Sequence, residues 1–166
     1  MIEIRKVISE KDISETARLA HAIWTDHYVP IIGQAQVSYM LDKFQSNAEI
    51  TRQINDGYEY YLAADGDSFL GYLALIPDVQ KASLMISKIY VKSELRGGGV
   101  GHKLLDLAEA ICSERGFTTI WLTVNKYNRN SIAWYERMGF VNVEAMVQDI
   151  GQGYVMDDFK MEKLIV

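Results

Sequence analysis

Hydrophobic and polar residues alternate at the start of the chain and then change to a helical spacing. Residues 2–7 alternate and predict a first strand. Residues 9–27 begin with a sequence typical of a helix N-terminus and continue with apolar positions three to four apart, so we expect a helix that ends near His27, before Pro30. A second helical region is expected over residues 34–55, broken around Ser46 and Asn47, with Asn47 capping its last piece.

From residue 58 onward the pattern becomes strand-like and then alternates between strands and helices. Polar turn residues at 65–68 separate two alternating runs, which predicts a hairpin. Further along, the pattern predicts a strand, a helix, a buried strand, a helix and a second hairpin, over residues 83–91, 101–115, 117–124, 128–138, and 140–150 with 154–164. Strands and helices in this order indicate a single α/β or α+β domain over residues 1–166.

The composition supports a globular protein and narrows the classes of partner. Of 166 residues, 49% are hydrophobic and 23% charged, which excludes a disordered or collagen-like chain. The net charge of −5 disfavours nucleic acid, because binding to phosphates needs a basic face, and is compatible with a cationic substrate. The single cysteine, Cys112, permits no internal disulfide and leaves no cysteine and histidine cluster for a metal. With no long apolar segment and a polar start, we expect a cytoplasmic protein that does not enter a membrane.

A glycine-rich loop lies between the predicted strand 83–91 and the amphipathic helix that follows it. Gly97, Gly98, Gly99 and Gly101 fall within five residues, and such a loop at a helix N-terminus directs backbone N–H groups toward an anion. A nucleoside-triphosphate loop would need Lys and then Ser or Thr after its last glycine, and a dinucleotide loop would need a glycine at position 102. His102 stands at that position and neither spacing is met.

The spacing that does fit is Arg96-x-x-Gly99-x-Gly101, which resembles the pyrophosphate-binding signature of the GNAT superfamily of acyl-CoA-dependent N-acyltransferases. A second segment, Asn128-x-x-Ser131-Ile132-x-x-Tyr135-x-x-x-Gly139-Phe140, is similar to another signature of that family. Together the matching residues run from about 83 to 141. Two motifs at the family's separation are much more specific than either alone.

The resemblance implies a fold and a set of acetyl-CoA contacts. The expected fold is a mixed, mostly antiparallel sheet of about seven strands, flanked by about four helices, with a splayed strand pair that holds acyl-CoA. Acetyl-CoA is then the cosubstrate and no metal is expected. The implied cofactor-binding residues are a strand segment, the glycine loop and one helix residue: Ile89, Tyr90, Val91, Arg96, Gly97, Gly98, Gly99, Val100, Gly101, His102 and Asn128.

Tyr135 is the catalytic residue that the resemblance implies, as the general acid that protonates the departing thiolate of CoA. Asn128 and Tyr135 are seven residues apart, which is about 700° of helical rotation, so they share one helix face. The structural alternative is that Tyr135 packs in the core beside Trp134 and Phe140.

The base that removes a proton from the attacking amine is left unassigned by the sequence. Many relatives carry a carboxylate on the central strand, whereas residues 82–93 contain no Asp or Glu and Met85 stands near that position. His27 is a candidate. Cys112 lies on the apolar stripe of its helix, so we expect a buried, inert thiol and direct transfer without an acyl-enzyme.

The acceptor pocket is expected between the first two helices, where Trp24, His27 and Tyr28 could contact an alkylammonium group, or could simply pack on the sheet. The leading hypothesis is an N-acetyltransferase for a small-molecule amine, such as a polyamine-like amine, or a peptide amine. The alternative is a non-catalytic acyl-CoA-binding or sensory module of the same fold. The hairpin at residues 149–158 could contact substrate or the second subunit of a homodimer.

Overall fold

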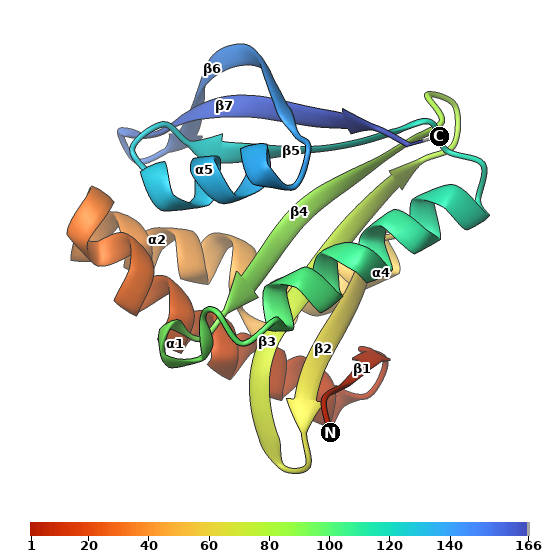
Figure 1. Cartoon of the computed structure of the whole chain (residues 1–166). Coiled ribbons are helices and arrows are strands. Elements are labelled where there is room, and N and C mark those ends of the chain that lie inside the picture. Colours follow the sequence, from red (N-terminus) through yellow and green to blue (C-terminus); the bar gives the residue numbers. More distant parts are fainter. Residues whose placement is uncertain (166) are drawn as a thin grey trace. The chain divides into compact units, whose positions relative to one another are not determined.

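The structure, a computed structural model, describes residues 1–165 and contains seven strands and five α-helices in that part of the chain (Figure 1). The strands are β1 (Glu3–Lys6), β2 (Glu59–Asp65), β3 (Ser68–Asp78), β4 (Ser83–Val91), β5 (Thr119–Asn125), β6 (Val141–Gly151) and β7 (Tyr154–Leu164). The helices are α1 (Glu10–Ile32), α2 (Gln34–Gln45), α3 (Asn47–Asn55), α4 (Val100–Glu114) and α5 (Arg129–Arg137), with a 3-10 turn over Ser93–Leu95.

The strands are hydrogen-bonded in the order β1-β2-β3-β4-β5-β7-β6. β4 and β5 run parallel, whereas β1 with β2, β2 with β3, β5 with β7, and β6 with β7 are antiparallel. The mixed, mostly antiparallel sheet expected from the sequence is therefore confirmed. The paired part of β4 and β5 runs from Ser83 opposite Thr119 to Ile86 opposite Leu122, and β4 continues beyond it to Val91.

The chain forms two compact units. The N-terminal unit contains residues 1–76 and 88–108, and the C-terminal unit contains residues 77–87 and 109–166. β4 contributes its first half to the C-terminal unit and its second half to the N-terminal unit, and α4 likewise contributes to both.

A continuous chain of buried hydrogen bonds joins the helices of the N-terminal unit to its strands. The indole N–H of Trp24 donates to the Tyr72 hydroxyl at 2.8 Å, and that hydroxyl donates to Gln45 Oε1 at 2.8 Å. Gln45 Nε2 donates to the Tyr60 hydroxyl at 3.0 Å, which in turn donates to Gln53 Oε1 at 2.6 Å. Each of these five side chains is at most 3% exposed, so the hydrogen bonds offset the cost of burying polar groups.

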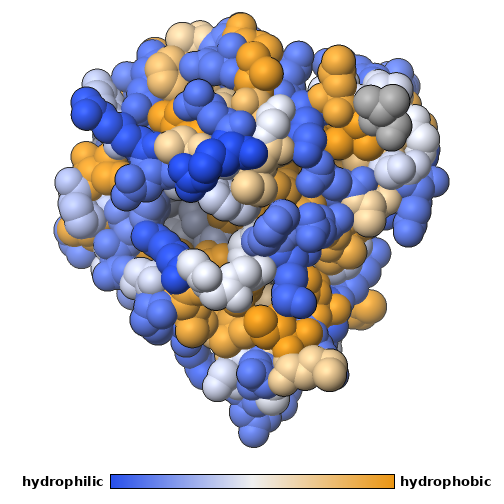
Figure 2. Space-filling model, viewed as in Figure 1, coloured by the Kyte–Doolittle hydropathy of each residue, from blue (hydrophilic) through white to orange (hydrophobic). Residues whose placement is uncertain are grey.

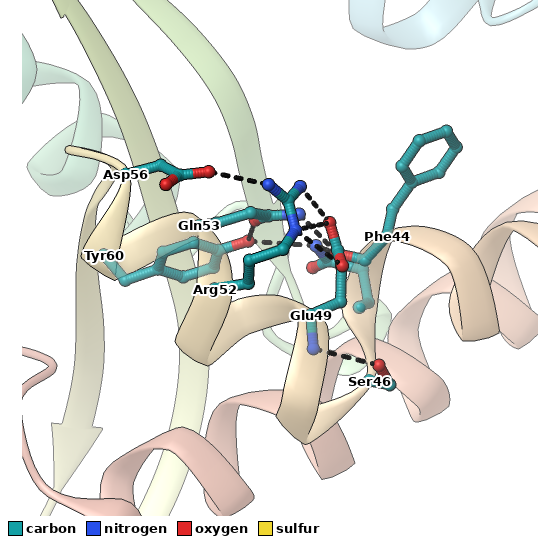
Figure 3. A network of polar contacts seen from close by, with 8 residues as sticks. Phe44, Ser46, Glu49, Arg52, Gln53, Asp56 and Tyr60 are labelled. Carbon is teal, nitrogen blue, oxygen red and sulfur yellow. Dashed lines mark hydrogen bonds and ion pairs between the residues drawn. The ribbon is translucent and has the colours of Figure 1, made fainter.

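Helix α3 is held at both ends by polar contacts (Figure 3). The Ser46 hydroxyl accepts a hydrogen bond from the Glu49 N–H at 3.2 Å and caps the helix. On its outer face Arg52 pairs with Glu49 one turn earlier and with Asp56 at 2.6 Å. Exposed pairs of this kind are screened by solvent and contribute little, so the cap and the buried glutamine, Gln53, matter more.

In the C-terminal unit, β7 pairs with β5 on one side and with β6 on the other, and β5 supplies much of the buried surface of this ladder. Ile120, Leu122 and Val124 alternate with half-buried residues, as expected for a strand with one face in the core. β6 is the edge strand of the ladder and is exposed along most of its length, with Val141 62% and Val147 65% exposed. On the face of the molecule seen in Figure 2, hydrophobic and hydrophilic residues are intermingled.

Two details of the sequence prediction were wrong. α1 does not end near His27 but continues through Pro30 to Ile32. Proline has no backbone N–H, so Pro30 cannot donate a helix hydrogen bond. Because Pro30 lies in the last turn of α1, only that turn is affected. The Gly33 N–H closes the turn by donating to the Val29 carbonyl at 2.9 Å.

The other correction concerns the N-cap of α3. Ser46, not Asn47, is the N-cap of α3, because a side chain with extended backbone at position 46 reaches the N–H of Glu49. Asn47 instead donates to the Ser14 hydroxyl at 2.8 Å. The extended conformation of Ser46 divides the region into two helices, which confirms the predicted break around Ser46 and Asn47.

Candidate active site

The glycine loop of the N-terminal unit is built to expose backbone N–H groups. Gly97 and Gly99 have φ of 84° and 86°, values that glycine adopts without strain. The first hydrogen bond into α4 runs from the Lys103 N–H to the Gly99 carbonyl at 3.0 Å. The N–H groups of Val100, Gly101 and His102 therefore belong to the first turn, where no carbonyl of the helix can accept them. The partial positive charge of these groups suits an anion.

The strand segment Ile89–Val91 lies directly before this loop and is closely packed against β3. A Cβ added to Gly71 would lie 2.5 Å from the Tyr90 carbonyl oxygen and 3.2 Å from the Val91 Cα. Glycine at position 71 is therefore required by the approach of the two backbones. Of the implied cofactor residues, the structure places this segment and the loop residues 96–102 in one unit.

The predicted acceptor residues form an aromatic cluster on α1 with Tyr90 of β4. The rings of Trp24 and Tyr28 lie 5.5 Å and 6.1 Å from that of Tyr90, edge to face, and the hydroxyls of Tyr28 and Tyr90 are 2.9 Å apart. Trp24 is only 3% exposed and its N–H is already bonded to Tyr72. This supports the packing interpretation for Trp24, whereas His27 and Tyr28 are half-buried.

His27 contacts the glycine loop through Arg96. The Arg96 guanidinium donates to His27 Nδ1 at 3.2 Å, and because a guanidinium can only donate, Nδ1 must be the accepting nitrogen. In the neutral ring the proton then resides on Nε2, which leaves that nitrogen a donor. This arrangement disfavours His27 as the base for the amine, because Nδ1 already accepts a hydrogen bond from Arg96 and Nε2 carries the proton.

Asn128 has a structural function that its place in a family motif did not reveal. It is the N-cap of α5, and its side-chain oxygen accepts a hydrogen bond from the Ser131 N–H at 3.3 Å. It is 5% exposed. Helix capping thus explains the asparagine at position 128, and the contact to the pantetheine arm stays a prediction.

Tyr135 lies on α5 at the edge of the core of the C-terminal unit. Its ring contacts those of Trp134 and Phe140, with centroids 5.3 Å and 5.8 Å away, and it is 9% exposed. Tyr135 therefore makes the packing contacts of the structural alternative, and its catalytic role stays a prediction. Asn128 and Tyr135 are both in the C-terminal unit, but Asn128 is the N-cap of α5 with non-helical backbone and not a residue of the helix face predicted to carry both.

Asp158 of β7 is a candidate that the sequence prediction missed. It is 6% exposed, and burial, reinforced by the charge of Asp157, raises its pKa to about 6. A hydrogen bond from Thr123 and the charge of Lys126 oppose that shift. A carboxylate with such a pKa can gain and lose a proton near neutral pH. In the sequence it stands in a hairpin strand rich in charges, where nothing distinguishes a buried Asp from a solvated one.

Lys88 of β4 is a second titratable group that the sequence did not single out. Its Nζ lies 5.9 Å from the centroid of the Tyr58 ring. Burial lowers its pKa to about 8, although the charge of Glu49 acts in the opposite direction. Lys88 is half-buried, and a lysine whose pKa is lowered by burial opposes folding while it is charged.

Lys88→Met is therefore expected to increase the free energy of unfolding at pH 7 by about 1–3 kcal/mol. The folded-state pKa lies below the ordinary value of 10.5, so the destabilisation is complete below about pH 8 and disappears above about 10.5. Urea unfolding at pH 7 and pH 10 measures this, and the gain should shrink at pH 10. An equal change at both values would show that packing, not charge, sets the effect.

Cys112 is buried and fully protonated at neutral pH. Burial raises the pKa of its thiol, and its sulfur lies 3.7 Å from the Phe117 carbonyl oxygen. A thiolate is needed for nucleophilic attack, so this arrangement supports the predicted inert thiol.

Comparison with known proteins identifies the family. The family model described as the acetyltransferase (GNAT) family matches residues 18–140. An uncharacterized N-acetyltransferase in the pepI 3′ region of Lactobacillus delbrueckii subsp. lactis is 25% identical over 96% of this chain and 95% of its own. N-alpha-acetyltransferase 30 of Schizosaccharomyces pombe is 29% identical over 48% of this chain and 55% of its own.

Among solved structures, the PaiA N-acetyltransferase from Thermoplasma acidophilum in complex with coenzyme A has the same fold. It superposes with a TM-score of 0.82 at 23% identity, covering 99% of each chain. Since the family model matches well over half of the sequence, the chain belongs to the GNAT family of acetyltransferases. The resemblance inferred from the two motifs is confirmed.

Residues 1–165 contain neither a membrane-spanning helix nor a cluster of metal ligands. No helix within residues 1–165 is long and apolar enough to cross a membrane. In the same part of the chain, no three His, Cys, Asp or Glu residues are grouped so that they could hold a metal ion.

Proposed function

We propose that the protein transfers an acetyl group from acetyl-CoA directly to a primary amine of a small molecule or a peptide. The observation that carries this proposal is the glycine loop, where two positive-φ glycines and the first turn of α4 present N–H groups to an anion. The family match and the relative solved with coenzyme A support acetyl-CoA as the source of that anion, through its pyrophosphate.

The roles of the individual residues are those that the family resemblance implies. The amides of residues 97–102 would bind the pyrophosphate, and the backbone of Ile89–Val91 would pair with the pantetheine arm. A backbone N–H directed at the thioester oxygen would stabilise the charge that develops when the amine attacks. Tyr135 would protonate the departing thiolate. A phenol with pKa near 10 and a thiol with pKa near 8.5 are close enough for this transfer to be easy, in model compounds.

The acceptor is tested with a panel of amines. Release of CoA thiol should be measured with polyamines, amino acids, aminoglycosides and peptide N-termini at fixed acetyl-CoA. The net charge of −5 favours cationic acceptors, so we expect the highest kcat/KM among amines that carry more than one positive charge. Highest activity on a neutral peptide would contradict that preference.

A non-catalytic module of the same fold is the alternative function. It would bind acetyl-CoA but release no thiol with any amine. Retention of Tyr135 and of the complete loop from Arg96 to Gly101 favours the enzyme.

A further inference from the structure

Helix α1 is connected to the glycine loop by a side-chain contact. The 3-10 turn Ser93–Leu95, which leads into the loop, lies against α1 (Figure 1). Arg96 directly follows that turn, and its Nη2 donates to His27 Nδ1 of α1 at 3.2 Å. Both residues belong to the N-terminal unit. The contact therefore joins the first helix to the predicted pyrophosphate loop within one unit.

The backbone of Arg96 is held by the turn, whereas its side chain is exposed. The Arg96 N–H donates to the Ser93 carbonyl at 3.3 Å, and Arg96 caps the turn with φ of −64° and ψ of 142°. Gly97 follows with φ of 84° and begins the loop. An exposed arginine side chain ordinarily samples many rotamers. The hydrogen bond to His27 restricts that freedom.

His27 is itself held in place by its neighbours. It lies within α1, is half-buried, and its ring meets that of Tyr28 edge to face with centroids 4.7 Å apart. The hydroxyl of Tyr28 lies 2.9 Å from that of Tyr90, in the β4 segment that precedes the loop. The nitrogen that accepts from Arg96 thus belongs to a ring packed against a side chain that is bonded to β4.

The partner of the Arg96 guanidinium is a neutral ring nitrogen rather than a carboxylate. Arg5 shows the contrast, because two of its N–H groups are bonded to the Asp12 carboxylate at 3.0 Å, which offsets its charge. The His27 Nδ1 accepts at Nη2 alone and carries no negative charge in the neutral ring. Arg96 therefore keeps its charge and its other N–H donors for an anion.

We propose that His27 is a positioning residue for acetyl-CoA binding, which holds the Arg96 guanidinium beside the loop so that it can bind the pyrophosphate. This inference rests on the function proposed above, in which the pyrophosphate lies on residues 97–102. It assigns His27 to the cofactor and not to the acceptor amine. His27 acts only through Arg96 and touches none of the reacting atoms.

The expected effect is on affinity and not on the chemical step. A side chain that is ordered before the ligand arrives loses less conformational entropy on binding, so the complex is tighter. Without His27 the guanidinium can still reach the anion, but it must first be ordered. Removing the accepting nitrogen should therefore raise Kd for CoA by about 3- to 10-fold, the range expected for one hydrogen bond.

His27→Phe is the variant that tests the contact, since it deletes Nδ1 and keeps an aromatic ring against Tyr28. Calorimetric titration with CoA should show the rise in Kd. In steady-state assays with the panel amine of highest kcat/KM, KM for acetyl-CoA should rise while kcat stays within about twofold of the parent. Because the contact is exposed, Tm should remain close to the parental value.

Two further variants separate the accepting nitrogen from other effects of the substitution. His27→Asn places an amide oxygen near the position of Nδ1, where it can accept from the guanidinium, and should restore Kd to within about twofold of the parent. His21→Phe makes the same replacement at an exposed histidine of the same helix and should leave Kd unchanged.

A double-mutant cycle shows whether His27 acts through Arg96. Arg96→Met removes the guanidinium and should weaken CoA binding by itself. Adding His27→Phe to Arg96→Met should change Kd no further, because the group that His27 positions is already gone. Equal losses with and without the guanidinium would mean that the histidine affects the site in another way.

Several results would overturn the assignment while leaving the acetyltransferase proposal standing. They are an unchanged Kd in His27→Phe, a loss that His27→Asn does not restore, additive losses in the cycle, or a rise in KM for the amine with that for acetyl-CoA unchanged. A parent protein that binds CoA but acetylates no amine would overturn the enzyme proposal alone. A parent that binds no CoA would overturn both.

Discussion

Tyr135→Phe is expected to lower kcat for acetyl transfer by about 10²- to 10⁴-fold, because it removes the hydroxyl that we propose protonates the thiolate and keeps the ring. The phenylalanine ring keeps the contacts with Trp134 and Phe140, so Tm and acetyl-CoA affinity should remain close to those of the parent. Stopped-flow and steady-state release of CoA thiol, together with calorimetric titration, measure the three quantities.

Tyr127→Phe is the matched control, since it removes a hydroxyl from an exposed tyrosine of the same unit and should leave kcat unchanged. Full turnover of Tyr135→Phe, under conditions where chemistry limits the rate, would exclude the general-acid role. A lower Tm with unchanged turnover would instead identify a buried hydroxyl whose hydrogen bond serves only the fold.

Gly101→Asp is expected to weaken acetyl-CoA binding by about 10²- to 10³-fold, because it places a negative charge beside the pyrophosphate in the first turn of α4. Gly101 is helical and is absent from the positive-φ glycines, so the new side chain strains no backbone. An Asp in the first turn of a helix even favours the fold through the helix dipole. Calorimetric titration measures the affinity, and Tm should not fall.

Gly101→Ala separates the added volume from the added charge and should lose much less affinity than the Asp variant. Gly99→Asp would be a poorer test, because the φ of 86° at that position makes any side chain strained. Unchanged affinity in folded Gly101→Asp would remove the glycine loop from the cofactor site, and most of the proposed function with it.

The order of elements was predictable because most of their boundaries carry local signals. Strand β4 was predicted over Ser83–Val91 with both ends correct, as its apolar run is bounded by polar residues. The C-terminal hairpin was marked by glycines at positions 151 and 153, both of which adopt positive φ. The end of α1 was missed, since a proline in the last turn of a helix loses little when the chain closes the turn elsewhere.

The sequence predicted only those parts of the candidate site that lie in a loop or helix with a countable motif. The loop and α5 belong to motifs whose spacing can be counted, so they were found. Asp158 and Lys88 owe their shifted pKa values to burial by residues distant in sequence, and no local pattern reports that. Asn128 belongs to a family motif and also caps a helix. The capping function could be recognised only from its hydrogen bond in the structure.

The buried hydrogen bonds that run from Trp24 to Gln53 also limit how this protein can change its acceptor. Turning α2 by one residue, about 100°, would withdraw Gln45 from two tyrosine hydroxyls at once. Each hydroxyl left without a partner costs about 1–3 kcal/mol, whereas exchanging an outward side chain costs almost nothing. Divergence toward a new amine is therefore expected to proceed by replacing side chains on stationary helices, so that relatives with different acceptors would share the positions of α1 to α3.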